Sequence, residues 1–198
     1  MKILLTGATG QLGKELIKTK PNNINLLTPN RFELDLKNYE DCKNIICLSK
    51  PDWVINCGAY TNVDKAEKEE ESVYKINFKA ADIFSKELEK KGGKILQIST
   101  DYVFDGSKEK PYKVNDLRNP QNIYGNSKLL AENAIMNNLK NNNQNIILRT
   151  SWIMSPIGSN FLLTIIDLLK NKEKINVVND QLGCMTSTKN LAKTCWRL

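Results

Sequence analysis

The chain has 198 residues, a net charge of +7 and no histidine. Apolar residues make up 40% of it, which at this length is enough for a buried core without stapling cross-links. No stretch reaches the ~18 uninterrupted apolar residues of a membrane span, and the N-terminus has no secretory signal pattern, so we expect a cytoplasmic protein without a membrane partner. The absence of histidine excludes Ser-His-Asp, Cys-His and His-metal mechanisms.

The basic residues argue against a nucleic-acid-binding protein, and the cysteines argue against a disulfide-linked one. Only four of the 29 basic residues are arginines, and the lysines are spread along the chain, whereas a nucleic-acid face needs clustered Arg with interleaved aromatics. We therefore expect no nucleic-acid partner. The five cysteines form no CxxC pair, and in a chain without a signal peptide they indicate reduced thiols.

Short apolar runs alternate with segments of helical periodicity from the N-terminus onward. Strands are predicted, in chain order, over 2–6, 24–27, 53–57, 94–98 and 146–149. Helices are predicted over 12–18, 38–49, 72–91 and 123–139. Buried strands that alternate with amphipathic helices are typical of a parallel sheet covered on both faces. The sequence therefore predicts an α/β fold with a doubly wound parallel sheet.

The remaining segments are less regular. A polar stretch from Ser99 to Gln121 has no periodicity, and a loop of this length inside a compact domain is usually functional. In the last third we predict a helix over 161–169, a strand over 174–178 and a helix from Ser187-Thr188, which provide its N-cap, to Leu198. That last helix has no predicted C-cap.

A glycine-rich turn follows the first predicted strand. Gly7, Gly10 and Gly13 have GxxGxxG spacing and open the first helix, where glycine lets a pyrophosphate approach the backbone and the helix N-terminus attracts it. The strand–turn–helix context predicts dinucleotide binding. No carboxylate stands in Leu27-Thr28-Pro29-Asn30-Arg31 to hold an adenosine ribose. This favours NADPH, with Arg31 at the 2′-phosphate, over NADH, although Arg31 also fits a solvated loop cation.

Tyr124 and Lys128 form a Tyr-x-x-x-Lys pair in the helix predicted over 123–139. The i,i+4 spacing places both side chains on one helix face. A free tyrosine has a pKa of about 10, too high for efficient acid–base work near neutral pH, and a nearby ammonium group lowers it. Such a pair also arises by chance, but its position after the fourth strand and the long loop favours a catalytic role.

Further segments extend this pattern over the whole chain. They are Asn56-Cys57-Gly58-Ala59-Tyr60-Thr61-Asn62-Val63-Asp64-Lys65-Ala66-Glu67, Ser99-Thr100-Asp101-Tyr102-Val103-Phe104-Asp105-Gly106, Arg149-Thr150-Ser151-Trp152 and Asp180-Gln181-Leu182-Gly183. With the glycine turn and the Tyr–Lys pair, the chain resembles the extended short-chain dehydrogenase/reductases. Within that superfamily it is similar to the dTDP-4-dehydrorhamnose reductase family, which implies a Rossmann fold and NAD(P)H-dependent reduction of dTDP-4-dehydrorhamnose to dTDP-L-rhamnose.

The resemblance implies roles for matching positions. The cofactor-binding positions are Gly7, Gly10, Gln11, Leu12, Asp35, Leu36, Ala59, Tyr60, Thr61, Tyr124 and Lys128. The catalytic positions are Thr100, Tyr124 as proton donor and Lys128, which also binds the nicotinamide ribose and tunes Tyr124. The substrate-binding positions are Thr100, Asp101 and Trp152. Leu12 and Leu36 equally fit core positions, and Trp152 equally fits a packing aromatic.

The chain departs from the family pattern in two respects. Met185 stands where the family usually has a proline, and family members continue beyond this length to complete the substrate domain. We therefore expect a C-terminally truncated reductase, with a NAD(P)-binding Rossmann domain at 1–150 and a partial substrate-binding region at 151–198. Some relatives pair through Mg²⁺ at glutamates, but Glu15 alone gives weak support for Mg²⁺, and a homodimer is left open.

Two other functions stay open. A sugar-nucleotide dehydratase or epimerase of the same superfamily is one, although dehydratases carry Thr-Asp-Glu where this chain has Thr100-Asp101-Tyr102. The other is a non-catalytic nucleotide-binding protein, either a regulatory subunit or an inactive fragment.

Overall fold

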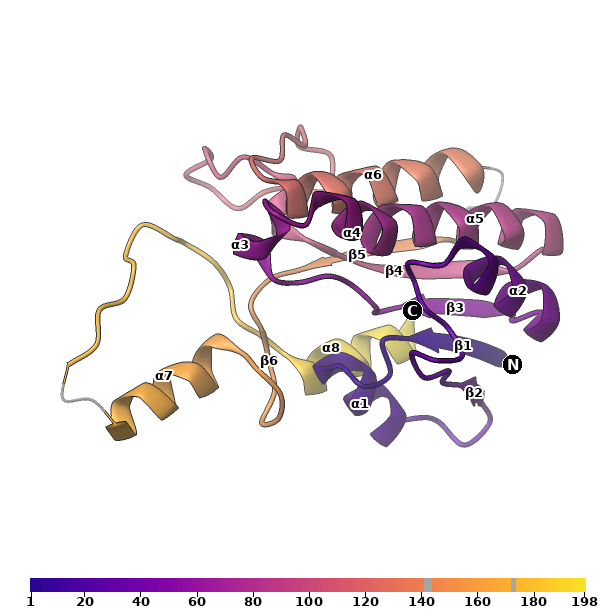
Figure 1. The fold of residues 1–198 in the computed structure, drawn as a ribbon, viewed down its shortest axis with the longest axis horizontal. Coiled ribbons are helices and arrows are strands. Elements are labelled where there is room, and N and C mark those ends of the chain that lie inside the picture. Colours follow the sequence, from indigo (N-terminus) through magenta and orange to yellow (C-terminus); the bar gives the residue numbers. More distant parts are fainter. Residues whose placement is uncertain (141–143, 172–173) are drawn as a thin grey trace.

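Five parallel strands form the central sheet of the computed structural model, which describes residues 1–140, 144–171 and 174–198. The strands are β1 (Lys2–Thr6), β2 (Asn25–Leu27), β3 (Trp53–Asn56), β4 (Lys94–Thr100) and β5 (Ile146–Thr150). They lie in the order β2-β1-β3-β4-β5 (Figure 1). The predicted doubly wound α/β fold is confirmed, and each predicted strand of this sheet is present.

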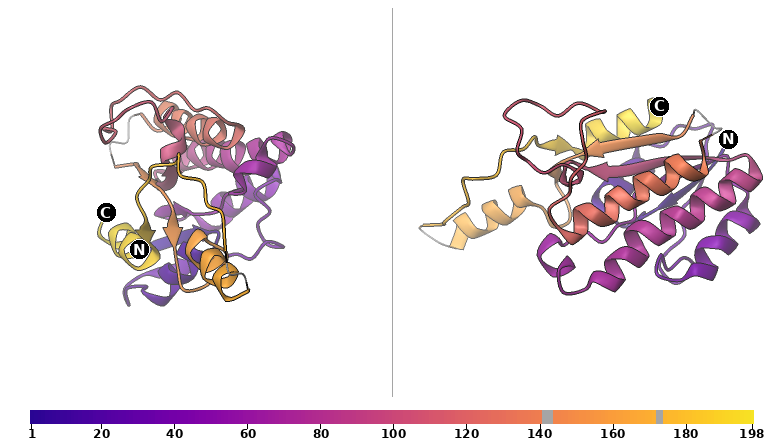
Figure 2. Two further views of the ribbon diagram at one scale, coloured as in Figure 1. Left: turned by 90° about the vertical axis from the view of Figure 1, so that its left-hand side faces the viewer. Right: turned by 90° about the horizontal axis from the view of Figure 1, so that it is seen from above.

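Helices cover both faces of the sheet (Figure 2). One face carries α1 (Gln11–Lys18) and α8 (Thr188–Arg197). The other carries α2 (Tyr39–Ser49), α4 (Glu70–Tyr74), the π-helical turn η1 (Lys75–Lys79), α5 (Ala80–Lys91) and α6 (Ile123–Asn138). Two short elements follow the strand ends, α3 (Val63–Ala66) after β3 and the 3₁₀ turn η2 (Asp101–Val103) after β4. Among the described helices, none has the length and apolarity needed to cross a membrane.

The strands read as continuous apolar runs because both of their faces are buried. In β1, Leu4 packs with α2, α5 and α6, whereas Ile3 and Leu5 pack with α1 and α8. Leu4 and Leu5 are fully buried. This double cover makes the sheet a rigid base for the loops at the carboxyl ends of its strands.

The predicted helix over 72–91 contains a π-helical turn. It comprises the end of α4, then η1, then α5, in one continuous run. The wider turn places Asn77 on the buried face, where it is only 2% exposed. π-turns inside helices are frequently found at functional sites.

The segment after β5 is less tightly packed than the rest. A short parallel pair, β6 (Ile153–Met154) with β7 (Thr186–Ser187), precedes α8. Helix α7 (Phe161–Asn171) contains no buried residue and stands apart from the sheet (Figures 1 and 2). Ser187 caps α8 as predicted, its Oγ accepting from the Asn190 N–H at 3.2 Å.

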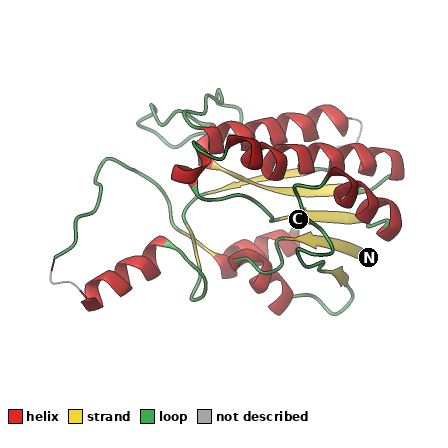
Figure 3. Ribbon diagram, viewed as in Figure 1, coloured by secondary structure: helices red, strands yellow, loops and turns green. Residues whose placement is uncertain are grey.

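The strand predicted over 174–178 is wrong. These residues lie in an irregular segment (green in Figure 3), and Val177 and Val178 are exposed. A β-strand is stabilised by hydrogen bonds and side-chain pairs to a neighbouring strand. Residues 174–178 pair with no strand in the part of the chain that the structure describes.

Candidate active site

The glycine turn between β1 and α1 packs against the backbone that follows β3. Gly7 has a positive φ of 68°, and a Cβ on it would lie 2.6 Å from the backbone nitrogen of Gly58. A Cβ on Gly13 would lie 2.2 Å from the carbonyl oxygen of Gly7. Side chains at these positions would therefore break the turn. Gly10 is the N-cap of α1 and has no side chain to occupy the first amide groups.

A row of buried polar side chains joins the carboxyl ends of β1, β3 and β4. Thr6 Oγ1 donates to Asn56 Oδ1 at 2.5 Å and accepts from the Gly58 N–H at 3.0 Å. Asn56 Nδ2 in turn donates to Gln97 Oε1 at 2.7 Å. From β1 the chain continues to β2 on one side of the sheet, and then crosses to β3, β4 and β5 on the other side. Ligands of open α/β sheets bind in the crevice at such a switch point, here between β1 and β3.

The residues expected along the cofactor surround this turn, but they differ in what their side chains do. Leu12 belongs to the apolar core under α1, which supports the alternative interpretation of this residue as core. Leu36 packs partly on the opposite core, with its Cδ1 2.6 Å from where a Cβ of Gly58 would be. Asp35 Oδ1 accepts from the Lys37 N–H at 3.0 Å.

The Gln11 side chain contacts the segment just before α7. Its Oε1 accepts from Asn160 Nδ2 at 2.9 Å, and its Nε2 donates to the Ser159 carbonyl at 3.2 Å. The backbone amide of Gln11, in the first turn of α1, is the group suited to an anion. The turn thus fits a pyrophosphate through backbone amides and a close approach that a Cβ would block.

Tyr124 is placed by the first turn of α6. Asn122 caps this helix, its Oδ1 accepting from the Gly125 N–H at 2.7 Å. Gly125 lets the helix approach η2 closely, because a Cβ there would lie 2.2 Å from the Tyr102 carbonyl oxygen. The rings of Tyr102 and Tyr124 meet edge to face at 5.7 Å. This packing brings Tyr124 to the end of β4, where Thr100 stands.

The surroundings of Tyr124 favour the protonated phenol. Burial raises its pKa to about 12, a hydrogen bond with Thr100 acts in the opposite direction, and Asp101 adds to the increase. Thr100 Oγ1 also donates to Asp101 Oδ1 at 3.1 Å. Burial raises the pKa of Asp101 as well. At neutral pH Tyr124 therefore keeps the proton on its phenol.

Lys128 lies one helical turn after Tyr124 and is 3% exposed. Its Nζ donates to the Ile98 carbonyl oxygen at 2.6 Å. Burial lowers the pKa of Lys128 to about 8, against the opposing effect of Cys57 and Glu132. Lys128 is not among the groups that shift the pKa of Tyr124, so its expected tuning of that phenol stays a prediction.

The sequence interpretation did not include Asn77, which connects two parts of the site. Asn77 Oδ1 accepts from the Tyr60 N–H at 2.8 Å, and Nδ2 donates to the Tyr60 carbonyl at 3.1 Å and to Ser127 Oγ at 2.9 Å. Ser127 Oγ donates to the Tyr124 carbonyl at 2.6 Å. Asn77 thereby holds the Ala59–Thr61 loop against the helix of Tyr124. The available signal was an amide among the apolar residues of the helix face that includes Val73 and Ala80.

A buried carboxylate below the site was also missed. Glu132, one turn after Lys128, is fully buried. It accepts from Ser99 Oγ at 2.6 Å, from Arg149 Nε and Nη2 at 2.9 and 2.6 Å, and from Arg118 Nη1 at 3.0 Å. Burial alone raises a carboxyl pKa, but these donors hold the pKa of Glu132 below its usual range. The cluster joins α6, β4 and β5 to the 104–122 loop.

The expected substrate residues lie at the ends of β4 and β5. Trp152 has a positive φ of 44°, and its ring packs on Phe161 at 5.1 Å and against Gly183. This contact agrees with the packing interpretation, and its sugar-nucleotide role stays a prediction. Thr150 pairs in register with Thr100, and its Oγ1 is buried without a hydrogen-bond partner among the described residues.

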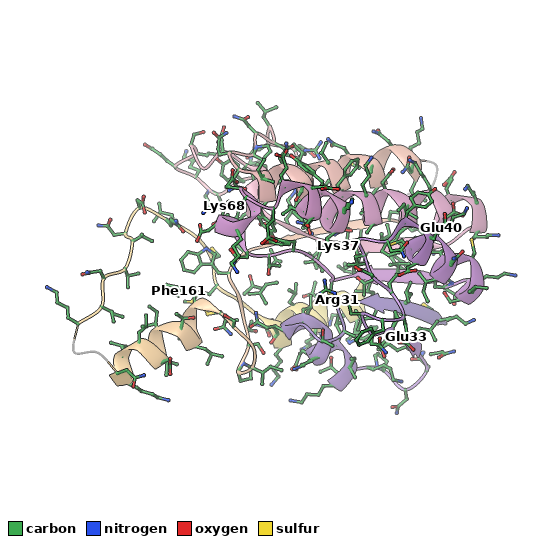
Figure 4. All side chains as sticks on the ribbon, in the orientation of Figure 1. Arg31, Glu33, Lys37, Glu40, Lys68 and Phe161 are labelled. Atoms are coloured by element: carbon green, nitrogen blue, oxygen red, sulfur yellow. The ribbon has the colours of Figure 1, made fainter. Side chains whose placement is uncertain are left out.

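In the loop between β2 and α2, Arg31, Glu33 and Lys37 are exposed and Asp35 is half-buried. Arg31 and Lys37 project from this loop (Figure 4), and Lys37 Nζ donates to Ser72 Oγ at 3.2 Å. Glu15 belongs to no group of three or more metal-binding side chains within the described ranges. The structure therefore adds no support for Mg²⁺ at this residue.

The parallel sheet, the glycine turn and the Tyr–Lys pair beside Thr100 define a protein of the short-chain dehydrogenase/reductase class with a Rossmann-like fold. The family model described as RmlD substrate binding domain matches residues 1–198. The chain is 39% identical over 193 residues to a dTDP-4-dehydrorhamnose reductase of Aggregatibacter actinomycetemcomitans. It belongs to the dTDP-4-dehydrorhamnose reductase (RmlD) family.

Solved structures agree with this assignment. A dTDP-4-dehydrorhamnose reductase from Clostridium acetobutylicum matches all of the chain with a TM-score of 0.93 and 40% identity. One from Bacillus anthracis, solved in complex with NADP, matches with a TM-score of 0.93 and 36% identity. The chain covers 69% and 70% of these two proteins. It spans 65% of the A. actinomycetemcomitans relative, which in turn covers 96% of the chain.

Proposed function

We propose that this chain binds NADPH and supplies the cofactor-binding and catalytic half of a sugar-nucleotide reductase. The reaction is reduction of the 4-keto group of dTDP-4-dehydro-6-deoxy-L-mannose to dTDP-L-rhamnose. The observation that carries the proposal is the approach of Tyr124 to Thr100, with Lys128 one turn away, at the carboxyl end of β4, two strands from β1 and its glycine turn. The similarity of the chain to dTDP-4-dehydrorhamnose reductases, one of them solved in complex with NADP, supports it.

In this proposal each residue has a distinct role. A bound reduced nicotinamide supplies the hydride for the carbonyl carbon. Tyr124 holds the proton for the developing alkoxide oxygen, and its high pKa keeps that proton on the phenol at neutral pH. Thr100 orients the same oxygen. The Lys128 ammonium group has three hydrogens, one of which is donated to the Ile98 carbonyl, and the other two are free to hold the nicotinamide ribose.

The proposal divides the chain into two regions. Residues 1–150 form the NAD(P)-binding Rossmann domain, with Gly7, Gly10 and the Ala59–Thr61 loop along the cofactor. Residues 151–198 form part of the substrate side, with Trp152 at the sugar nucleotide. Asp101 stands next to Thr100 on that side.

The test compares the chain alone with a fusion to the carboxyl-terminal part of the C. acetobutylicum relative. NADPH oxidation is followed by absorbance with dTDP-4-dehydro-6-deoxy-L-mannose. We expect the fusion to consume NADPH, and Tyr124→Phe to lower its rate about 10²–10⁴-fold while NADPH still binds. Tyr39→Phe, which changes an exposed tyrosine at the start of α2, is the matched control.

Three results would separate the alternatives. Near-normal turnover in Tyr124→Phe would show that another group donates the proton. A fusion that binds NADPH but reduces no 4-keto sugar would favour a non-catalytic nucleotide-binding protein. Failure of the chain to bind NADPH at all would refute the proposal.

A further inference from the structure

We propose that Asn160 is a positioning residue that connects the phosphate-binding turn to helix α7 through the side chain of Gln11. The inference rests on the proposed binding of NADPH at the glycine turn. It assigns Gln11 a second role, in which its backbone serves the pyrophosphate and its side chain holds a helix 149 residues away.

The first observation is that both ends of the Gln11 amide form hydrogen bonds to residues 159–160. Its Oε1 accepts from Asn160 Nδ2 at 2.9 Å and its Nε2 donates to the Ser159 carbonyl at 3.2 Å. The residue before Ser159 is Gly158, which has a φ of 83°. A Cβ on Gly158 would lie 3.0 Å from Gln11 Cγ. The 158–160 turn is thus fitted around this one side chain.

The second observation is that both ends of the Asn160 amide also form hydrogen bonds. Its Oδ1 accepts from the Leu163 N–H at 3.1 Å and caps α7, while its Nδ2 donates to the Ser155 carbonyl at 2.9 Å as well as to Gln11. The three bonds fix the orientation of the amide. They make one side chain both the cap of α7 and its link to α1.

The third observation is that α7 is weakly packed against the rest of the fold. The helix contains no buried residue, and Phe161, Leu162 and Ile166 are exposed. Phe161 contacts Trp152, which belongs to the same segment as α7. A ligand that restrains the Gly10–Gln11 backbone therefore also restrains the start of α7, and by linkage an ordered α7 favours that ligand equally.

The experiment measures amide hydrogen exchange of the whole chain with and without NADPH. In the wild type, NADPH is expected to slow exchange in the peptides that cover 7–16 and 158–166. Asn160→Ser keeps a capping hydroxyl for α7 but has no amide donor for Gln11. Gln11→Met keeps the side-chain length and the backbone N–H. Asn160→Ser should keep the NADPH-dependent protection of 7–16. In both variants the NADPH-dependent protection of 158–166 should fall at least about fivefold.

Two controls make the result specific. Asn171→Ser changes an asparagine at the other end of α7 whose Nδ2 donates to the Asp167 carbonyl at 3.0 Å, and it should behave like the wild type. Without NADPH, Gln11→Met should already speed exchange of 158–166, which tests the Gln11–Asn160 contact independently of the cofactor.

Each remaining outcome decides between the inference and the proposed function. Protection of 7–16 without protection of 158–166 in the wild type would overturn the inference and leave NADPH binding intact. Equal protection of 158–166 in the wild type and both variants would show that the coupling takes another route. No protection of 7–16 in the wild type would overturn the proposed function and the inference together.

Discussion

Lys128 and Ile98 are joined by a buried hydrogen bond in which the ammonium Nζ lies 2.6 Å from the carbonyl oxygen. The contact fixes the lysine of the Tyr–Lys pair to the strand that carries Thr100. It also keeps a cation where burial disfavours charge, and burial lowers the pKa of Lys128 to about 8.

This lowered pKa predicts a pH-dependent difference between the wild type and Lys128→Met. An unfolded lysine has a pKa of about 10.4, so the unfolded state binds more protons between that value and about 8. The contribution of Lys128 to the free energy of unfolding therefore rises with pH through this window, by up to about 3 kcal/mol. Lys128→Met lacks this rise.

Urea unfolding of both proteins across that pH window measures the effect. The comparison between the two proteins is required because the raised pKa values of Tyr124 and Cys195 act in the opposite direction as pH increases. The lost hydrogen bond to Ile98 shifts the Lys128→Met curve without changing its slope. Parallel pH curves for the two proteins would contradict the prediction.

Arg31 should determine the preference for NADPH over NADH. It stands exposed on the loop after β2 (Figure 4), and residues 27–31 contain no carboxylate to hold the adenosine ribose. A charge-assisted hydrogen bond contributes about 1.5–3 kcal/mol, so Arg31→Ala should weaken NADPH binding by about tenfold or more and leave NADH unchanged. Nicotinamide fluorescence titrations give both affinities.

The matched control is Lys18→Ala, which removes an exposed cation in the last turn of α1. It should leave the NADPH-to-NADH ratio unchanged. Equal affinities of the wild type for the two cofactors would refute the assignment of Arg31.

The Glu132 cluster should stabilise the fold strongly. Glu132→Gln leaves Arg118 and Arg149 without their carboxylate, and breaking a buried pair from one side costs about 3–5 kcal/mol. Lys86→Met breaks the pair with Asp82, in which the lysine is 54% exposed, and should cost less than about 1 kcal/mol. Chemical denaturation of both variants measures the two losses of stability. Losses of similar size would contradict the prediction.

Acid should abolish the same contribution in the wild type. The folded pKa of Glu132 is lowered, so the stabilisation is present above the unfolded value of about 4.3. It is lost as the pH falls through the folded pKa. Glu132→Gln should therefore lose less stability than the wild type on acidification.

NADPH should stabilise the chain while the sugar nucleotide adds little. A ligand at about 100 times its Kd stabilises by about 2.7 kcal/mol, which corresponds to a Tm increase of about 5–10 °C for a domain of this size. The proposed substrate side, residues 151–198, is open, since α7 has no buried residue and Leu182 is 98% exposed. Thermal shift with each ligand and an absorbance assay with the 4-keto sugar measure both effects. Robust NADPH oxidation by the chain alone would contradict this prediction.

Local patterns of the sequence determined most of the fold. The strands and helices of the sheet depend on burial and periodicity within a few residues, and the glycine turn depends on backbone freedom at Gly7 and Gly13. The position of Tyr124 and Lys128 on one helix face follows from their spacing. These features were predictable because their physical causes lie within one element and its neighbours in the chain.

Only the tertiary structure decided which distant groups meet. Asn77 joins Tyr60 to Ser127 over 17 and 50 residues, and Gln11 meets Asn160 over 149. The residues 174–178 have strand-like composition, yet a strand needs a partner strand beside it, and no strand of the described ranges pairs with them. Spacing brings Lys128 close to Tyr124, but the burial that sets both pKa values comes from the packing of α6 on β4.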